Sequence, residues 1–126
     1  MKQKNLYVLD ETDSKIVHLF TELGMPRNLA KTLMFVSQVE ECCSADVEHG
    51  TDLRQPEVCL AVNEFVRRGW IKKREVKKKG KGRPQHIYRF TSSLRDIVTS
   101  FEKEKMLEIG TLEKNLSEIR TIIRSR

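Results

Sequence analysis

The chain has 126 residues, of which 38% are hydrophobic and 33% are charged, and its formal net charge is +6. This length and composition favour one domain with a small core and a largely solvated surface. No apolar run approaches the roughly 20 residues that a membrane-spanning helix needs, and the three cysteines form no C-x-x-C pair. We therefore expect neither a membrane protein nor a disulfide framework, and a reducing cytoplasm fits best.

Two helices are predicted in the first 40 residues. The stretch DETDSKIVHLFTELG has Thr12 or Asp13 as its N-cap and Gly24 as a left-handed C-terminal cap. In MPRNLAKTLMFVSQVE, Pro26 takes a first-turn position. The apolar stripes expected to face the core are Ile16, Val17, Leu19, Phe20 and Leu23 on the first helix, and Leu29, Ala30, Leu33, Met34 and Val36 on the second.

A short helix and a longer helix, joined by a tight link, are predicted next. Ser44 is suited to cap the short helix SADVEHG, and Gly50 is suited to end it. The longer helix, RQPEVCLAVNEFVRRG, accepts Pro56 in its first turn and closes at Gly69. We expect its core face to comprise Val58, Val62, Phe65 and Val66, and its other faces to carry Gln55, Glu57, Cys59, Leu60, Asn63 and Arg67.

Residues 70–90 are predicted to form a β-hairpin. Two strand-like arms, residues 70–76 and 85–90, flank a turn that contains Gly80, Gly82 and Pro84. Ile87, Phe90 and Trp70 are expected to touch the core, whereas Arg89 and the lysines stay in solvent.

The excess positive charge lies in this hairpin and the residues just before it. Residues 67–89 contain eleven basic side chains and one acidic side chain, so they carry +10 and the rest of the chain sums to −4. Such a segment favours a polyanionic partner, of which nucleic acid is the commonest. A solubilising loop is the alternative. A membrane surface fits less well, because the charges lie between strand-like runs and not along an amphipathic helix.

One long helix is predicted from Ser93 to near Arg124. Its seam of Ile109, Leu112, Leu116, Ile119 and Ile123 has the 3-4-3-4 spacing of a coiled coil, and Leu94, Val98 and Phe101 form an earlier stripe. The phase slips across residues 102–106, where we expect local unwinding. A partner helix is favoured over folding back on the chain's own domain, because the seam is thin for so long a helix. We expect residues 1–91 to form one domain and residues 92–126 a dimerisation helix.

The order of these elements resembles a winged helix-turn-helix, and the sequence is similar to transcriptional regulators of the MarR, TrmB and ArsR type. The resemblance covers roughly residues 23–91. Its specific parts are L-x-Q-P-x-V at residues 53–58 and R-R-G-W-I at residues 67–71, and LGMPRNLAKTLMFV is similar to the TrmB-like helix before the reading head. The implied fold class is mainly α with a small β-hairpin wing and a long C-terminal dimerisation helix.

The resemblance also implies roles in binding double-stranded DNA. The helix that begins near Arg54 would lie in the major groove, with Gln55 and Asn63 reading adenine edges and Glu57 accepting from a cytosine amino group. Ser44 would help to hold a phosphate. Leu60 departs from the basic or polar residue common in these families and would suit a thymine methyl. The full predicted interface is Ser44, Arg54, Gln55, Glu57, Cys59, Leu60, Asn63 and Arg67, with Lys77, Lys78, Lys79, Lys81 and Arg83 supplying salt-dependent backbone affinity from the wing.

Metal binding and catalysis have little support. ArsR-type metal sensors can place a cysteine pair near the helix that Cys42 and Cys43 precede, but adjacent thiolates chelate one ion poorly, and ordinary cysteines are the favoured interpretation. Redox sensing through Cys59 is a further alternative. KGKGRP lacks the following helix and the G-K-[ST] of a phosphate-binding loop, and there is no nucleophile elbow or HExxH. We predict no metal site, no cofactor and no catalytic residue.

The sequence therefore predicts a homodimeric, sequence-specific DNA-binding regulator of transcription, associated with the nucleoid in the cytoplasm. Two other classes stay open: an architectural protein that coats DNA with little sequence preference, and a protein-interaction adapter with the same fold. No effector domain remains after the helices are assigned, so any small-molecule effector is expected in the cleft of the dimer.

Overall fold

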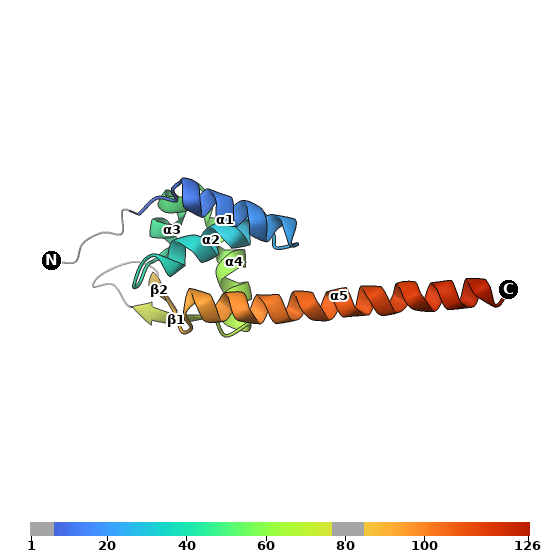
Figure 1. Ribbon diagram of the computed structural model, residues 1–126. Helices are drawn as coiled ribbons and strands as arrows, with labels where there is room; N and C mark the ends of the chain where they lie inside the picture. The colour runs from blue at the N-terminus through green and yellow to red at the C-terminus, as the bar shows by residue number, and fades with distance from the viewer. Residues whose placement is uncertain (1–6, 77–84) are drawn as a thin grey trace. The chain divides into compact units, whose positions relative to one another are not determined.

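The computed structural model of the chain describes residues 7–76 and 85–126. Within these ranges it contains five helices and one two-stranded antiparallel sheet (Figure 1). In chain order the elements are α1 (Glu11–Glu22), α2 (Arg27–Ser37), α3 (Ser44–Thr51), α4 (Gln55–Arg67), β1 (Ile71–Val76), β2 (Gln85–Phe90) and α5 (Leu94–Arg124). The chain divides into two compact units, Met1–Ser93 and Leu94–Arg126. The predicted mainly helical architecture, with one hairpin and a long C-terminal helix, is confirmed.

The first helix begins earlier than its sequence pattern predicts. Asp10 is the N-cap of α1, so the predicted caps Thr12 and Asp13 lie inside the helix. Asp10 Oδ1 accepts from the Asp13 N–H at 2.8 Å, and Asp13 Oδ2 accepts from the Asp10 N–H at 3.1 Å. This capping box satisfies two backbone donors at once. The Tyr7 hydroxyl also donates to Asp13, and burial together with this carboxylate raises the pKa of Tyr7 above its usual value.

The buried stripe of α1 is narrower than predicted. Val17 and Phe20 are buried, whereas Leu19 and Leu23 are about half exposed, at 52% and 51%. The glycine that follows the helix has the predicted left-handed conformation, with a φ of 101° at Gly24. The C-terminal end of α1 is therefore confirmed, but only one side of its apolar stripe reaches the core.

The core is built around α2. This helix packs against α1, α3, α4 and β2, so it is buried on nearly every side. Five consecutive residues, residues 32–36, are each 1% exposed or less. Helical spacing predicts a single apolar face without Thr32 and Phe35, yet both are buried. Thr32 is tolerated there because its hydroxyl donates to the backbone oxygen of Asn28 at 2.9 Å.

Gly50 has a packing role and does not end its helix as predicted. α3 extends beyond it and is closed by Asp52, whose φ of 60° lies in the left-handed region. Gly50 itself is buried inside α3, and a Cβ there would overlap the ring of Phe35 and come within 2.6 Å of the Tyr7 backbone oxygen. Glycine is required because the other elements approach α3 this closely.

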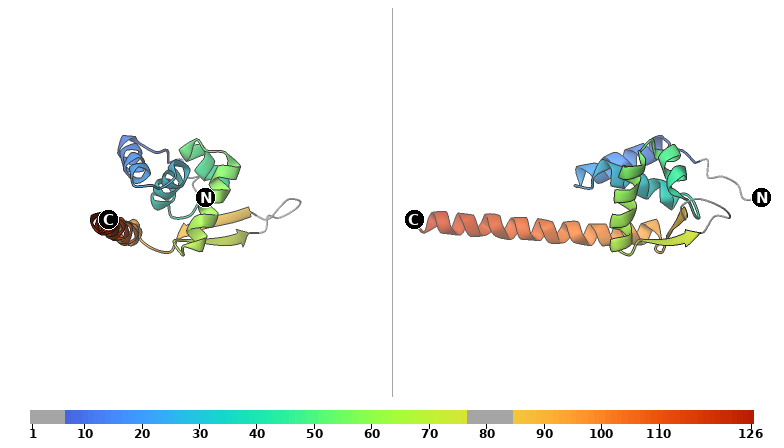
Figure 2. Two further views of the ribbon diagram at one scale, coloured as in Figure 1. Left: turned by 90° about the vertical axis from the view of Figure 1, so that its right-hand side faces the viewer. Right: turned by 180° about the vertical axis from the view of Figure 1, so that it is seen from behind.

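The hairpin pairs Ile71 with Phe90 and continues in register to Val76 with Gln85. An isolated backbone bridge joins Cys42 to Tyr88 on the edge of β2 away from β1. Figure 2 shows the end of α4 leading directly into β1. Ile71 and Tyr88 are the buried strand residues, so the predicted core contact of Ile87 is wrong. Because side chains alternate between faces, Ile87 lies on the side of the sheet opposite Tyr88.

The second unit is a single helix of 31 residues, about 47 Å long at 1.5 Å per residue. It is helical throughout residues 102–106, so the local unwinding predicted there does not occur (Figure 1). Lys105 fills the seam position between Phe101 and Ile109. Its ammonium group lies 2.9 Å from Glu108 and 5.1 Å from the centre of the Phe101 ring. Val98, of the earlier predicted stripe with Leu94 and Phe101, is 42% exposed, and the role of this stripe in dimerisation stays a prediction.

Candidate nucleic-acid interface

The N-terminus of α3 is capped by Cys43 and not by the predicted Ser44. The backbone N–H of Cys43 donates to Asp46 Oδ2 at 3.0 Å, which fixes the first turn of the helix. Ser44 Oγ donates instead to Glu48 Oε2 at 3.1 Å. The hydroxyl proton of Ser44 is therefore used within α3, and its predicted contact with a phosphate stays a prediction.

The link between α3 and α4 is a tight turn. Asp52 turns the chain with its left-handed backbone, Leu53 is 8% exposed and anchors the turn, and Arg54 is the N-cap of α4. Asp52 can take this conformation because a short polar side chain tolerates positive φ better than most. The two helices and their turn form the helix-turn-helix that the sequence predicted.

Opposite faces of α4 have opposite character. The buried face comprises Val58, Ala61, Val62 and Phe65. Val66 was predicted to belong to this face but is 37% exposed, and Ala61 completes the helical spacing in its place. On the outer face Asn63 is exposed and Leu60 is 70% exposed, and Gln55 is exposed in the first turn of the helix. Two of the polar side chains predicted to read DNA, Gln55 and Asn63, are therefore accessible to a partner.

Cys59 belongs to the same outer surface but is only partly exposed. Its sulfur accepts a hydrogen bond from Asn63 Nδ2 at 3.6 Å. This contact orients the Asn63 side chain along α4, which leaves its amide oxygen and one amide hydrogen for a further partner.

Glu57 has partners within the protein at both carboxylate oxygens. Oε1 accepts from the backbone N–H of Arg54 at 2.9 Å, and Oε2 accepts from Asn28 Nδ2 at 2.9 Å. Glu57 therefore caps α4 and ties it to α2, and its predicted contact with cytosine stays untested. Asn28 was not predictable as a partner of Glu57, because it lies 29 positions earlier and no local signal links it to α4.

The end of α4 carries an ion-pair cluster. Arg67 donates to Glu64 through Nε at 3.0 Å and Nη2 at 2.5 Å, and Arg68 Nε donates to the same carboxylate at 2.8 Å. These guanidinium groups lower the pKa of Glu64 to about 2, so its carboxylate is charged at neutral pH. The charge of Arg67, predicted to face DNA, is partly offset within its own helix.

The base of the wing is strongly positive. Lys72, Lys73 and Arg74 are exposed along β1, as is Arg89 on β2. Arg74 forms a two-point ion pair with Glu41, at 2.7 and 3.3 Å, which fastens the hairpin to the loop after α2. The five wing cations of the predicted interface, Lys77, Lys78, Lys79, Lys81 and Arg83, lie outside the described residues.

The cysteines do not form a metal site in the described part of the chain. Within residues 7–76 and 85–126, no group of three or more His, Cys, Asp or Glu side chains is placed to hold an ion. Cys42 is 2% exposed, and burial raises the pKa of its thiol to about 12, which makes it unreactive at neutral pH.

Within residues 7–76 and 85–126, none of the helices combines the length and the apolar character that crossing a membrane requires.

Comparison with known proteins identifies similar folds. No family model matches the chain, and no curated protein matches it in sequence. A solved structure described as a possible transcriptional regulator from Methanosarcina mazei Go1 superposes with a TM-score of 0.59 and 13% identity, over 81% of this chain and 87% of that one. A transcriptional regulator homologue from Pyrococcus horikoshii OT3 superposes with a TM-score of 0.50 and 18% identity, over 80% of this chain and 97% of that one. At these identities the likeness shows the fold alone, and it supports the winged-helix architecture predicted from the sequence.

Proposed function

We propose that this chain is a dimeric, sequence-specific regulator of transcription that binds double-stranded DNA. The observation that carries the proposal is α4 of the helix-turn-helix, which buries four apolar residues, presents exposed Asn63 on its outer side and exposes Gln55 in its first turn. An α-helix is about 10–12 Å across, and the major groove of B-DNA is about 12 Å wide. The printed descriptions of both similar structures as transcriptional regulators also support this function.

The wing supplies the second part of the proposed interface. β1 and β2 lead directly to residues 77–84, which carry five basic side chains and no acidic one. Cations at this density bind phosphates and displace condensed counterions, so they add affinity without reading sequence. We assign the reading of bases to α4 and most of the salt-dependent affinity to the wing, on the backbone or in the minor groove. A DNA partner would place the protein at the nucleoid in the cytoplasm.

The proposed dimer forms through α5 of a second copy of the chain. Ile109, Leu112, Leu116, Ile119 and Ile123 are between 46% and 64% exposed and share one side of the helix. Glu113 and Arg120 border this seam on one flank. In an antiparallel pair, Glu113 of each chain would lie near Arg120 of the other, whereas a parallel pair would bring Glu108 near Glu113 with like charge. Charge and exposure therefore favour an antiparallel dimer, with residues 92–126 as the dimerisation helix and residues 1–91 as the DNA-binding domain.

Selection of bound DNA from a random pool, at two salt concentrations, tests the proposed function. A regulator should enrich one two-fold related motif at both concentrations, because two reading heads in a symmetric dimer address two half-sites. Binding without an enriched motif but with a steep salt dependence would identify an architectural protein instead. If the protein does not bind DNA at low salt, the remaining alternative is a protein-interaction adapter with the same fold.

Replacement of Gln55 by alanine should relax the preference at one base position of the selected motif. Gln55 is exposed in the first turn of α4, and a two-point contact with a base is worth about 1–3 kcal/mol of discrimination. Affinity for unrelated DNA should change little. The measurement is competition binding with the motif and its single-base variants. Gln38→Ala, which removes the same side chain from an exposed site after α2, is the matched control. Equal losses on all sequences would mean that Gln55 contacts only the backbone.

Replacement of Lys78, Lys79 and Lys81 by alanine should weaken binding to every DNA sequence. Removing one lysine–phosphate interaction lowers the slope of log K against log salt by about 0.9, so the slope should fall by up to about 2.7. Titrations at several salt concentrations measure it. A variant with Lys15, Lys103 and Lys114 replaced by alanine removes the same charge from exposed sites elsewhere and should keep most of the slope. Equal slopes of log K against log salt in the two triple variants would mean that the wing does not contact DNA.

A further inference from the structure

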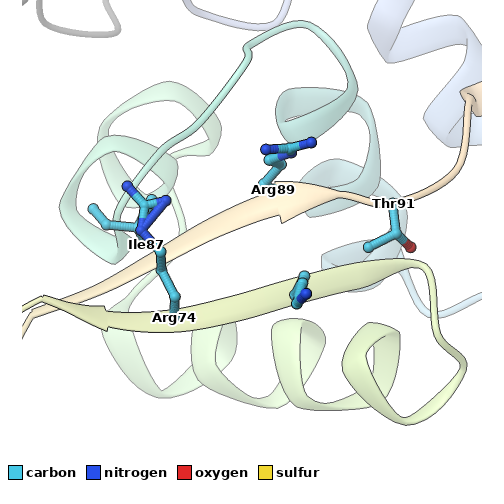
Figure 3. A pocket seen from close by; sticks show the side chains of 5 residues that line it. Arg74, Ile87, Arg89 and Thr91 are labelled. Carbon is cyan, nitrogen blue, oxygen red and sulfur yellow. The ribbon is translucent and has the colours of Figure 1, made fainter.

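The hairpin carries a pocket that the proposed reading of DNA does not use. Its volume is about 380 Å³, and it is lined by Lys72, Arg74, Ile87, Arg89 and Thr91. Figure 3 shows the labelled side chains Arg74, Ile87, Arg89 and Thr91 gathered over β1 and β2. The strand residues of this set belong to the face opposite buried Ile71 and Tyr88. The pocket therefore lies on the outward side of the sheet.

Two cations in this pocket oppose each other directly. The strand register pairs Lys72 with Arg89, so both side chains leave the same face at the same level of the ladder. Like charges directly opposite each other destabilise a sheet. Within residues 7–76 and 85–126, neither side chain has a hydrogen bond or an ion pair. Arg74, one step along the hairpin, is by contrast held by Glu41 at 2.7 Å. Among the described residues, Lys72 and Arg89 thus have no counter-charge, whereas the neighbouring Arg74 is neutralised by Glu41.

The remaining lining residues indicate what kind of anion would fit. Ile87 is partly exposed and offers an apolar surface between Arg74 and Arg89. The Thr91 hydroxyl donates to the Gly69 backbone oxygen at 2.6 Å, so it can only accept from a ligand. The donors left for a ligand are therefore the ammonium group of Lys72 and the guanidinium group of Arg89, which suit the oxygens of a phosphate or carboxylate. The volume lies in the lower part of the usual range for small-molecule sites, about 300–1,000 Å³.

We propose that this outward face of the hairpin binds a small organic anion: a phosphate or carboxylate group held between Lys72 and Arg89, with a short apolar part against Ile87. The site belongs to a single chain, whereas the sequence analysis expected any effector in the cleft of a dimer. A DNA phosphate has the same charged group, but it offers no apolar part to a concave site floored by Ile87. The anion site does not depend on the proposed function, because it needs neither DNA nor a second copy.

The test is a titration of isotope-labelled protein with butyl phosphate, followed by nuclear magnetic resonance at constant ionic strength. The signals of Lys72, Ile87, Arg89 and Thr91 should shift and saturate. Inorganic phosphate should shift the same signals with about threefold or more weaker affinity, because it lacks the apolar part. Lys72→Gln and Arg89→Gln should each weaken butyl phosphate binding about tenfold, the usual effect of removing one charge-assisted hydrogen bond.

Lys73→Gln is the matched control, because it removes the same charge from the same strand on the opposite face. It should leave butyl phosphate affinity within about twofold of the wild type. Equal weakening by Lys73→Gln, or shifts that never saturate, would overturn the proposal, since either result means general charge screening. The same titration is finally carried out with a short DNA duplex in place of butyl phosphate. If the duplex shifts these signals and butyl phosphate does not, the pocket belongs to the DNA backbone and the small-anion site is wrong. Circular dichroism should show that Lys72→Gln keeps its fold, because the substitution relieves the opposition to Arg89.

Discussion

Replacing Leu112 and Leu116 together by lysine should convert the proposed dimer into a folded monomer that no longer binds its operator tightly. The two leucines are 62% and 55% exposed on a single chain, so the substitutions cost the isolated fold little. In the proposed dimer the same side chains are buried, and each contributes about 1.5–3 kcal/mol. Lysine at both positions removes that contribution and adds like charges across the seam. Sedimentation velocity should show the wild type as a dimer at tens of micromolar and the variant as a monomer.

DNA affinity should fall with the loss of the dimer. Two linked reading heads bind the second half-site at a raised effective concentration, so separating them should reduce operator affinity by about 10²–10⁴-fold. Weak binding to a half-site should survive, because α4 and the wing are untouched. Leu107→Lys with Thr111→Lys adds the same charge on the side of α5 away from the seam, where Leu107 is 74% exposed. That control should stay dimeric. A wild-type monomer at these concentrations, or a double leucine variant that stays dimeric, would contradict the proposed seam.

Replacing Gly50 by alanine should destabilise the first unit by about 3 kcal/mol or more. The new methyl group would overlap the ring of Phe35, which is 0% exposed and has no room to move, and would come within 2.6 Å of the Tyr7 backbone oxygen. Overpacking a filled core typically costs about 1–3 kcal/mol, and a clash with two elements at once lies at the upper end or beyond. The midpoint of thermal unfolding should fall by about 12 °C or more. Urea denaturation followed by circular dichroism gives the free energy directly.

Gly110→Ala is the control, because the chain offers a second helical glycine whose added methyl group would meet no atom within 4 Å. In an open helical site, alanine is more favourable than glycine by about 0.5–1 kcal/mol, so this variant should be slightly more helical than the wild type. The opposite signs of the two glycine substitutions separate packing from helix propensity. Unchanged stability of Gly50→Ala would mean that the N-terminal segment and Phe35 yield to the methyl group, and that α3 does not need glycine there.

The candidate interface was predictable where one element contributes all of its residues. The exposure of Leu60 and Asn63 follows from helical spacing alone, since both lie away from the buried Val58 and Val62. Gln55 precedes these valines by three and seven positions, on the same side of the helix, and it is exposed in the first turn of α4. The structure exposes Gln55 and Asn63, and their contact with DNA stays a prediction. The side chains that hydrogen-bond to Glu57 and Arg74 from other parts of the chain were not predictable. Asn28 reaches Glu57 from 29 positions away, and Glu41 reaches Arg74 from 33 positions away.

The caps were predicted one to three residues late, for a physical reason. Asp10 and Asp13 can each accept a backbone hydrogen bond at the start of α1, and Cys43 and Ser44 stand side by side before α3. Sequence shows that a capping group is near but does not decide between neighbours that compete for the same N–H groups. The choice depends on contacts such as the Tyr7 hydroxyl on Asp13, which only the folded chain brings together.

The sequence by itself determined the order and type of the elements, the hairpin arms and the concentration of positive charge, because helical spacing, glycine punctuation and charge runs are local properties. Tertiary structure alone decided which residues at the margins of the predicted apolar faces are buried. It placed Ala61 in the core and Val66 outside it, and it turned Tyr88 inward and Ile87 outward. It also packed the ring of Phe35 so close to Gly50 that no other side chain fits there. It also set Lys72 against Arg89, since cross-strand register depends on the pairing of two strands and not on either strand alone.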